Sequence, residues 1–241
     1  MRTIVIIFLL LSLSSDIVQG QSNNDRFVSS LFQLDEFIKR QDKFIDYMDT
    51  EKYHGTPYNH PNYLKGNVYK GNTLLAKGVA LRYNAIADEM EIKKTLDTPI
   101  SEARPLTKSP DIFVKIEDAI FVFAPYQGGI QGGGYFQVLH EGEKIDVFKK
   151  LNKKFIPAKP AKTSITRAFK ARFVDKPIYY LVTKTGKFYE LPSSKNKKLK
   201  VFGKNKEVIS KFVAENKLDL NEEKDLVATI IFFNSLKNIE L

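Results

Sequence analysis

The hydrophobic pattern begins with a short apolar run at the N-terminus. Ile4–Leu13 is almost entirely apolar, follows the basic Arg2, and is itself followed by a polar stretch ending in the small residue Gly20. Such a run is too short to span a bilayer, which takes about 20 apolar residues, but it has the build of an export signal. The sequence therefore predicts a signal peptide over residues 1–20, cleaved before Gln21, and a secreted or periplasmic protein. It predicts no transmembrane segment after signal removal.

A helical period follows the signal peptide. From Asn24 to about Thr50 the apolar residues recur at spacings of three, four or seven: Phe27, Leu31, Leu34, Ile38, Ile45 and Met48. This spacing predicts an amphipathic helix. The next stretch, Tyr53–Pro61, is interrupted by Gly and Pro and predicts a loop. Residues 21–62 are accordingly expected to form an N-terminal helix and a Pro-containing loop.

Residues 63–203 carry the pattern of short β-strands separated by turns. Turn residues recur every 8–12 positions, which is typical of an antiparallel β meander that is barrel- or sandwich-like. Gly78 is expected at a bulge in the first long strand. The predicted strands are Thr73–Tyr83, Ala87–Ile92, Ile112–Ile116, Ile120–Phe123, Tyr135–Leu139, Lys144–Phe148, Ala168–Val174, Ile178–Thr183 and Lys187–Leu191.

Residues 204–241 return to a helical period. Asn205 is expected to cap a helix that ends near Glu215, and Asp219 with Glu222 has the spacing of a capping box that opens a second helix. Two such helices form a hairpin that must pack on something, here one face of the sheet. Phe212, Leu226, Ile230 and Phe233 are expected to be buried. The predicted fold class is α+β.

Composition excludes several kinds of chemistry. Hydrophobic residues make up 43% of the chain and charged residues 27%, as in folded soluble domains. The chain has no cysteine, which excludes disulfides, thiol catalysis and zinc–thiolate sites. No cofactor is implied by any motif.

The positive charge is concentrated in one region. The formal net charge is +10, and residues 149–211 contain 19 Lys or Arg residues against three acids. A basic band of this kind favours an anionic envelope polymer as partner, or another envelope protein, although a solvated sheet face with Lys-rich turns would look the same. Nucleic acid is disfavoured, because the aromatic residues of the band lie in strand-like runs that need them for packing. The candidate anion-binding residues are Lys170, Arg172, Lys195, Lys197, Lys198 and Lys200.

Two carboxylates are the best candidates for catalysis. Glu89 and Glu91 share one face of a predicted strand, while Asp88 points to the other face. Neighbours at this spacing could meet the 5–10 Å separation of carboxyl groups that a glycosidase needs. A polar strand face supplies such pairs routinely, so the same residues also fit a non-catalytic sheet.

Histidines and glycines give weaker hypotheses. His54 and His60 could ligate zinc with a nearby carboxylate, but their spacing matches no short metal motif. Tyr126–Gly134 contains five glycines and matches neither a dinucleotide-binding nor a Walker pattern. It predicts a mobile hairpin loop that could cover a binding surface.

Three short motifs carry a family resemblance. Pro57-Tyr58 with Pro61, then Leu81–Asn84, then Ala87–Glu91 resemble an uncharacterised family of exported proteins of Bacteroidetes-type bacteria. The resemblance extends over nearly all of the mature chain, including a Lys-rich hairpin region followed by a helical hairpin. It implies export and a β-rich fold, and it carries over no catalytic residue because the family has no assigned activity.

The expected function is that of an exported non-enzymatic binding or scaffolding protein of the bacterial envelope. The alternative is a hydrolase acting on a carbohydrate or anionic polymer, with Glu89 and Glu91 as its acids. Carboxylates and histidines that converge in one concave pocket would favour the enzyme, and dispersed ones would favour the binding protein.

Overall fold

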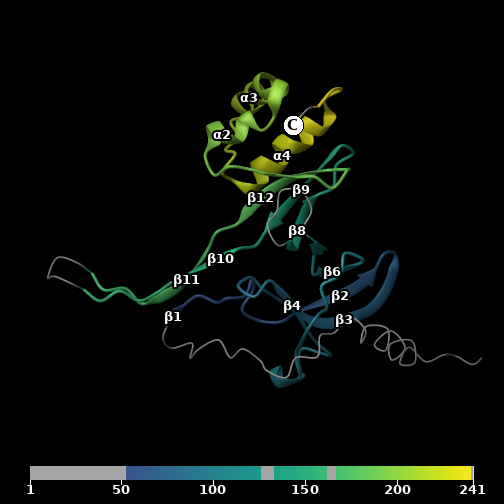
Figure 1. Ribbon diagram of the computed structural model, residues 1–241, viewed down its shortest axis with the longest axis vertical. Coiled ribbons are helices and arrows are strands. Elements are labelled where there is room, and N and C mark those ends of the chain that lie inside the picture. The colour runs from purple at the N-terminus through teal and green to yellow at the C-terminus, as the bar shows by residue number, and fades with distance from the viewer. Residues whose placement is uncertain (1–52, 126–132, 162–166, 240) are drawn as a thin grey trace, which may run out of the picture.

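The structure is a computed structural model that describes residues 53–125, 133–161, 167–239 and 241 (Figure 1). The predicted signal peptide and the helix expected over 24–50 lie outside the described residues. So does most of the glycine-rich loop, since residues 126–132 are not described.

A ten-stranded antiparallel sheet dominates the fold. Its spatial order is β13-β12-β9-β8-β7-β6-β2-β3-β4-β5. The edge strands β13 and β5 each pair with one neighbour, so the sheet is open and does not close into a barrel. The strands are β2 (Leu64–Lys70), β3 (Thr73–Asn84), β4 (Glu89–Lys93), β5 (Arg104–Pro105), β6 (Ile112–Ile116), β7 (Ala119–Ala124), β8 (Gly134–His140), β9 (Ile145–Lys150), β12 (Ile178–Thr183) and β13 (Phe188–Glu190).

A bulge bends the longest strand at the predicted place. Along β3, Lys77 and Gly78 together oppose the single residue Asn67 of β2. Gly78 has a φ of +66°, which glycine adopts without steric cost. Its N–H donates to Asn67 Oδ1 at 2.9 Å, so the amide that leaves the ladder is still satisfied.

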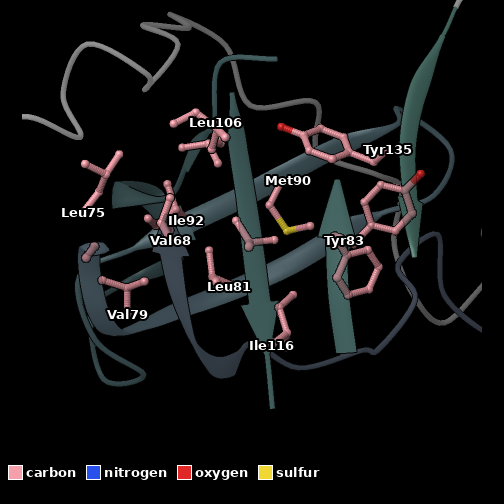
Figure 2. Packing of buried hydrophobic residues seen from close by; sticks show 14 of the residues in the cluster. Val68, Leu75, Val79, Leu81, Tyr83, Met90, Ile92, Leu106, Ile116 and Tyr135 are labelled. Atoms are coloured by element: carbon pink, nitrogen blue, oxygen red, sulfur yellow. The ribbon is translucent and has the colours of Figure 1, made fainter. Parts of the chain in front are cut away.

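One half of the sheet curls around its own core. Buried side chains from β2, β3, β4, β6, β7 and β8 form a single cluster, part of which Figure 2 shows around Leu81 and Met90. Tyr83 of β3 and Tyr135 of β8 meet with ring centroids 6.1 Å apart, although several strands separate β3 from β8 in the sheet order. The curl therefore brings the turn between β3 and β4 next to the start of β8.

The other half of the sheet is covered by helices on one face. Side chains alternate along β9 and β12, so that Val147 and Leu181 face the helices. Their neighbours Tyr180 and Val182 lie on the opposite face with Phe136 and Phe188. The helices are α2 (Lys195–Lys200), α3 (Lys206–Glu215) and α4 (Glu223–Ser235), with a short 3₁₀ turn at Gly203–Asn205.

Helix α4 is held against β9 by one asparagine. Asn234 Oδ1 accepts hydrogen bonds from the backbone N–H groups of Lys144 and Ile145, at 3.1 and 2.9 Å, and its Nδ2 donates to Ile145 O at 2.9 Å. Phe233 beside it is fully buried and meets Phe202 edge-on at 5.0 Å. The helical hairpin thus packs on the sheet through both polar and apolar contacts.

The ends of these helices differ in part from the sequence prediction. Helix α3 begins directly after Asn205, as predicted, but the Asn205 side chain donates to Asn238 O and does not cap the helix. Helix α4 begins at Glu223, later than predicted. Asp219 does not cap it; the carboxylate of Asp225 instead accepts the N–H of Asp219 at 2.8 Å.

The burial predicted for the hairpin holds except at one residue. Leu226, Ile230 and Phe233 are buried as predicted. Phe212 is only half-buried, because its ring stacks on Phe232 at 3.9 Å, outside the helix–sheet core.

A second, three-stranded sheet was not predicted. Its order is β1-β11-β10, with β1 at Tyr53–His54, β10 at Lys153–Ile156 and β11 at Ala171–Asp175. Strands β10 and β11 are antiparallel and extend away from the rest of the chain (Figure 1). We call residues 153–176, from the start of β10 to just beyond β11, the arm.

Candidate anion-binding surface

The arm is strongly basic. Over residues 153–176 the sequence has eight Lys or Arg residues and one acid, Asp175. That acid pairs with Lys153 Nζ at 2.8 Å, so one basic residue is compensated and the others are left in excess. All the other described basic residues of the arm are exposed: Lys154, Lys159, Arg167, Lys170, Arg172 and Lys176. The arm therefore presents a concentrated positive field to solvent.

Strand register separates the arm into a basic face and an aromatic face. Lys154 pairs with Val174 and Ile156 with Arg172, so Lys154 and Arg172 point to the same side of the hairpin. Lys170 directly precedes β11, two residues before Arg172.

The opposite side of the hairpin carries aromatic rings. Phe155 pairs directly with Phe173, and their ring centroids are 5.1 Å apart. Tyr53 of β1 meets Phe173 edge-on, also at 5.1 Å. These rings stabilise the arm where it has few buried residues, because cross-strand aromatic pairs stabilise a two-stranded ribbon.

The other predicted basic residues form a separate group on α2. A hairpin or loop was predicted there, but residues 195–200 are helical. Lys195, Lys197 and Lys200 are exposed on this helix. Helix α2 lies with the other helices, whereas β11 belongs to the arm at a distance from them (Figure 1). The predicted basic band is thus divided between two places.

Lys198 differs from its neighbours because it is buried. Its residue is 5% exposed, and Nζ donates to Leu220 O at 2.6 Å and to Asn221 Oδ1 at 3.2 Å. Burial lowers the pKa of this amine, an effect that Asp219 opposes in part. Lys198 ties α2 to the loop between α3 and α4, so it does not present its charge to a ligand.

Glu91, one of the two carboxylates proposed for catalysis, makes structural contacts. Glu91 is 6% exposed and its Oε2 accepts from Arg82 Nη2 at 2.8 Å and from the Tyr63 hydroxyl at 2.6 Å. The Arg82 guanidinium lies between two rings, 3.5 Å from the centroid of Tyr58 and 4.2 Å from that of Tyr63. Burial, and then the hydrogen bond to Glu91, raise the pKa of Tyr63. Glu91 therefore does not form a catalytic pair with Glu89.

Asp88 stands on the other side of the sheet, as the alternation predicted. It lies in the turn between β3 and β4 with a φ of +53°. Its Oδ1 accepts from the Tyr83 hydroxyl at 2.6 Å and from the Tyr135 N–H at 3.1 Å. Its Oδ2 faces Lys108 Nζ at 3.4 Å and Lys150 Nζ at 3.6 Å. This cluster was not predicted, because no local signal in the sequence connects the β3–β4 turn to β8 and β9.

The described histidines do not gather with carboxylates. His54 is exposed on β1, and the ring of His60 contacts the backbone of Asn62 two residues away. Among the described residues no three His, Asp or Glu side chains are placed to share a metal ion. A cavity of about 240 Å³ beside Arg82 is lined by one imidazole, His60, and one carboxylate, Glu117.

Comparison with known proteins gives no assignment. No model of a protein family matches the chain, and no curated protein or solved structure matches it either. The resemblance to exported Bacteroidetes-type proteins stays a prediction. Within the described part of the chain, none of the helices has both the length and the apolar character needed to cross a membrane.

Proposed function

We propose that this protein is an exported, non-enzymatic binding protein of the bacterial envelope that attaches to an anionic polymer through its arm. The observation that carries the proposal is the charge of the arm, with eight basic residues and one acid over residues 153–176. The polymer would carry sulfate, phosphate or carboxylate groups at short intervals. The protein would act outside the cytoplasm, as the predicted signal peptide requires.

The geometry of the basic face supports a linear ligand. Lys154 and Arg172 lie on one side of a narrow ribbon, and Lys170 extends the series toward the tip of the arm. Arg172 also stacks over Phe169, with 5.4 Å between its Cζ and the ring centroid, which limits the freedom of the guanidinium. A row of charges on an exposed strand pair suits contacts repeated along a chain, and such binding weakens steeply with salt.

A lipid surface fits the arm less well than a polymer does. Membrane-surface segments have basic residues flanking an apolar face that enters the headgroup region. In the arm the rings of Phe155 and Phe173 pack against each other at a tilt, and Lys154 and Arg172 project from the opposite side. The basic face therefore meets an anionic partner without inserting the rings.

Retention on heparin-agarose, a sulfated polyanion, tests the proposal. The mature chain is compared with a Lys154→Gln/Lys170→Gln/Arg172→Gln variant over a series of salt concentrations. Removing three contacts should lower the slope of log affinity against log salt by about two units. The matched control changes Lys195, Lys197 and Lys200 of α2 to Gln, which removes the same charge elsewhere.

Three results would overturn the proposal. Equal retention of all three proteins would show that the arm is only a solvated surface, and equal loss in both variants would show a dependence on net charge alone. Binding to phosphatidylglycerol vesicles in the absence of heparin binding would assign the arm to lipid instead.

A further inference from the structure

Asp88 and Lys150 come together from distant parts of the chain. Asp88 lies in the β3–β4 turn, Lys150 ends β9, and 62 positions separate them in sequence. In the sheet order β8, β7, β6 and β2 stand between β9 and the β3–β4 hairpin, and the curl of the sheet brings the two side chains together. Lys150 Nζ lies 3.6 Å from Asp88 Oδ2.

The two oxygens of Asp88 have different surroundings. Oδ1 accepts from two groups of fixed position, the Tyr83 hydroxyl at 2.6 Å and the Tyr135 N–H at 3.1 Å. Oδ2 accepts only a long bond from the flexible amine of Lys108, at 3.4 Å, and faces Lys150 Nζ at 3.6 Å. This arrangement suits acyl transfer from Asp88 to an amine. The donors to Oδ1 would stabilise the negative charge that develops there, and the amine of Lys150 lies beside Oδ2, the oxygen that would leave.

We propose that Lys150 and Asp88 form an intramolecular isopeptide bond, an amide between Nζ and Cγ. Lys150 first gives one proton to Asp88 Oδ2 and attacks Cγ with the freed lone pair. In the tetrahedral intermediate Oδ1 carries the negative charge and is stabilised by Tyr83 and Tyr135. A second proton leaves Nζ and reaches Oδ2 by way of Lys108, the Cγ–Oδ2 bond breaks, and one water is released.

Burial favours the neutral, nucleophilic form of Lys150, since its side chain is only 20% exposed. The amine is held in place by a bond to Gly133 O at 3.3 Å and by the ring of Phe136, whose centroid lies 4.9 Å away. Burial lowers the pKa of Lys150, and Lys108 adds to this effect, whereas Asp88 opposes it. The remaining exposure of Lys150 and Asp88 gives the released water a route to solvent.

Gly134 permits the approach of the two groups. It has a φ of +143°, and a Cβ at this position would collide with both Lys150 Nζ and Asp88 Oδ2. Any other residue would therefore force the amine and the carboxylate out of place. The absence of a side chain keeps the reacting atoms in contact at the start of β8.

An amide here would give a cysteine-free chain the covalent tie that disulfides give other exported proteins. It would connect the β3–β4 turn with β9 and so fix the curl of the sheet. Because the closed loop is long, it would stabilise the fold mainly by restricting the unfolded chain.

Mass spectrometry of the denatured, purified protein tests this inference. Intact wild-type chain is expected to be lighter than its sequence by the mass of one water, and a proteolytic digest should yield one branched peptide that joins Asp88 to Lys150. Cyclisation of an N-terminal Gln21 would remove ammonia, a different mass, and peptide mapping places each loss on its own residue.

Two controls make the result specific. Lys150→Arg keeps the charge but removes the amine, so it should have the full mass and a lower melting temperature. Lys153 and Asp175 are an internal control, because they are only 2.8 Å apart but Asp175 is 76% exposed; they should yield linear peptides. Linear peptides with free Lys150 and Asp88 in folded wild-type protein would overturn the inference, whatever the stability of the variant and whatever the arm binds.

Discussion

Arg82 on β3 and Glu91 on β4 are directly paired in the sheet register, and their side chains form a buried ion pair with 2.8 Å between Nη2 and Oε2. Removing one member leaves an uncompensated buried charge, which typically costs about 3–5 kcal/mol. Arg82→Met alone is therefore expected to destabilise the protein by that amount in urea unfolding. The double variant Arg82→Met/Glu91→Leu should be more stable than Arg82→Met, and a double variant at least as unstable would contradict this account.

Alkaline pH should unfold the protein through its buried tyrosines. Burial raises the folded-state pKa of Tyr83 and Tyr135, whereas both ionise near pH ~10 in the unfolded chain. Their contribution to stability is full below the unfolded-state pKa and is lost as pH rises above it, at about 1.4 kcal/mol per pH unit for each tyrosine. Urea unfolding at a series of alkaline pH values measures this slope, and a flat profile would refute it.

The helical hairpin should depend on the face of α4 that meets the sheet. Phe233 is fully buried, so Phe233→Ala is expected to cost about 3–5 kcal/mol. Ile231 on the same helix is 48% exposed, and Ile231→Ala should change the free energy of unfolding by less than about 0.5 kcal/mol. Thermal unfolding of both variants checks the difference. Equal effects would mean that α4 does not dock on β9 as described.

Gly134 and Gly71 allow the cost of a steric collision to be separated from the cost of backbone strain. Both have positive φ, +143° and +52°, but an added Cβ has nothing within 4 Å at Gly71. Gly71→Ala should cost about 1–2 kcal/mol from the backbone alone. Gly134→Ala should cost more, since it adds a collision with Lys150 and Asp88 to a backbone region that is nearly glycine-only. Unfolding by urea compares the two variants, and equal losses would show that the Lys150–Asp88 contact is not tight.

The predictions that the structure confirms rest on local signals in the sequence. The bulge at Gly78 and the extent of α3 followed from a glycine within a strand pattern and from helical spacing. The pairing of Arg82 with Glu91 was also within reach, because a turn after Asn84 places these residues opposite each other in a hairpin.

The elements that were not predicted depend on contacts between residues far apart in the sequence. Strand β10 reads Lys-Lys-Phe-Ile and forms because β11 returns beside it and because Phe155 meets Phe173. Helix α2 is rich in lysine, and its conformation is supported by the burial of Leu199 and by the bond from Lys198 to Leu220 O.

The parallel pairing of β1 with β11 has a mechanical consequence. Tyr53 aligns with Ala171 and His54 with Arg172, and the segment that follows β1 leads to Tyr58, whose ring covers Arg82. A tensile load on the arm would pass along the backbone from β10 into β9 and from β11 into β12, two strands that pair with each other in the large sheet. The pairing of β1 with β11 adds a lateral support that leads toward the ion pair of β3 and β4, so part of the load would also reach the other half of the sheet.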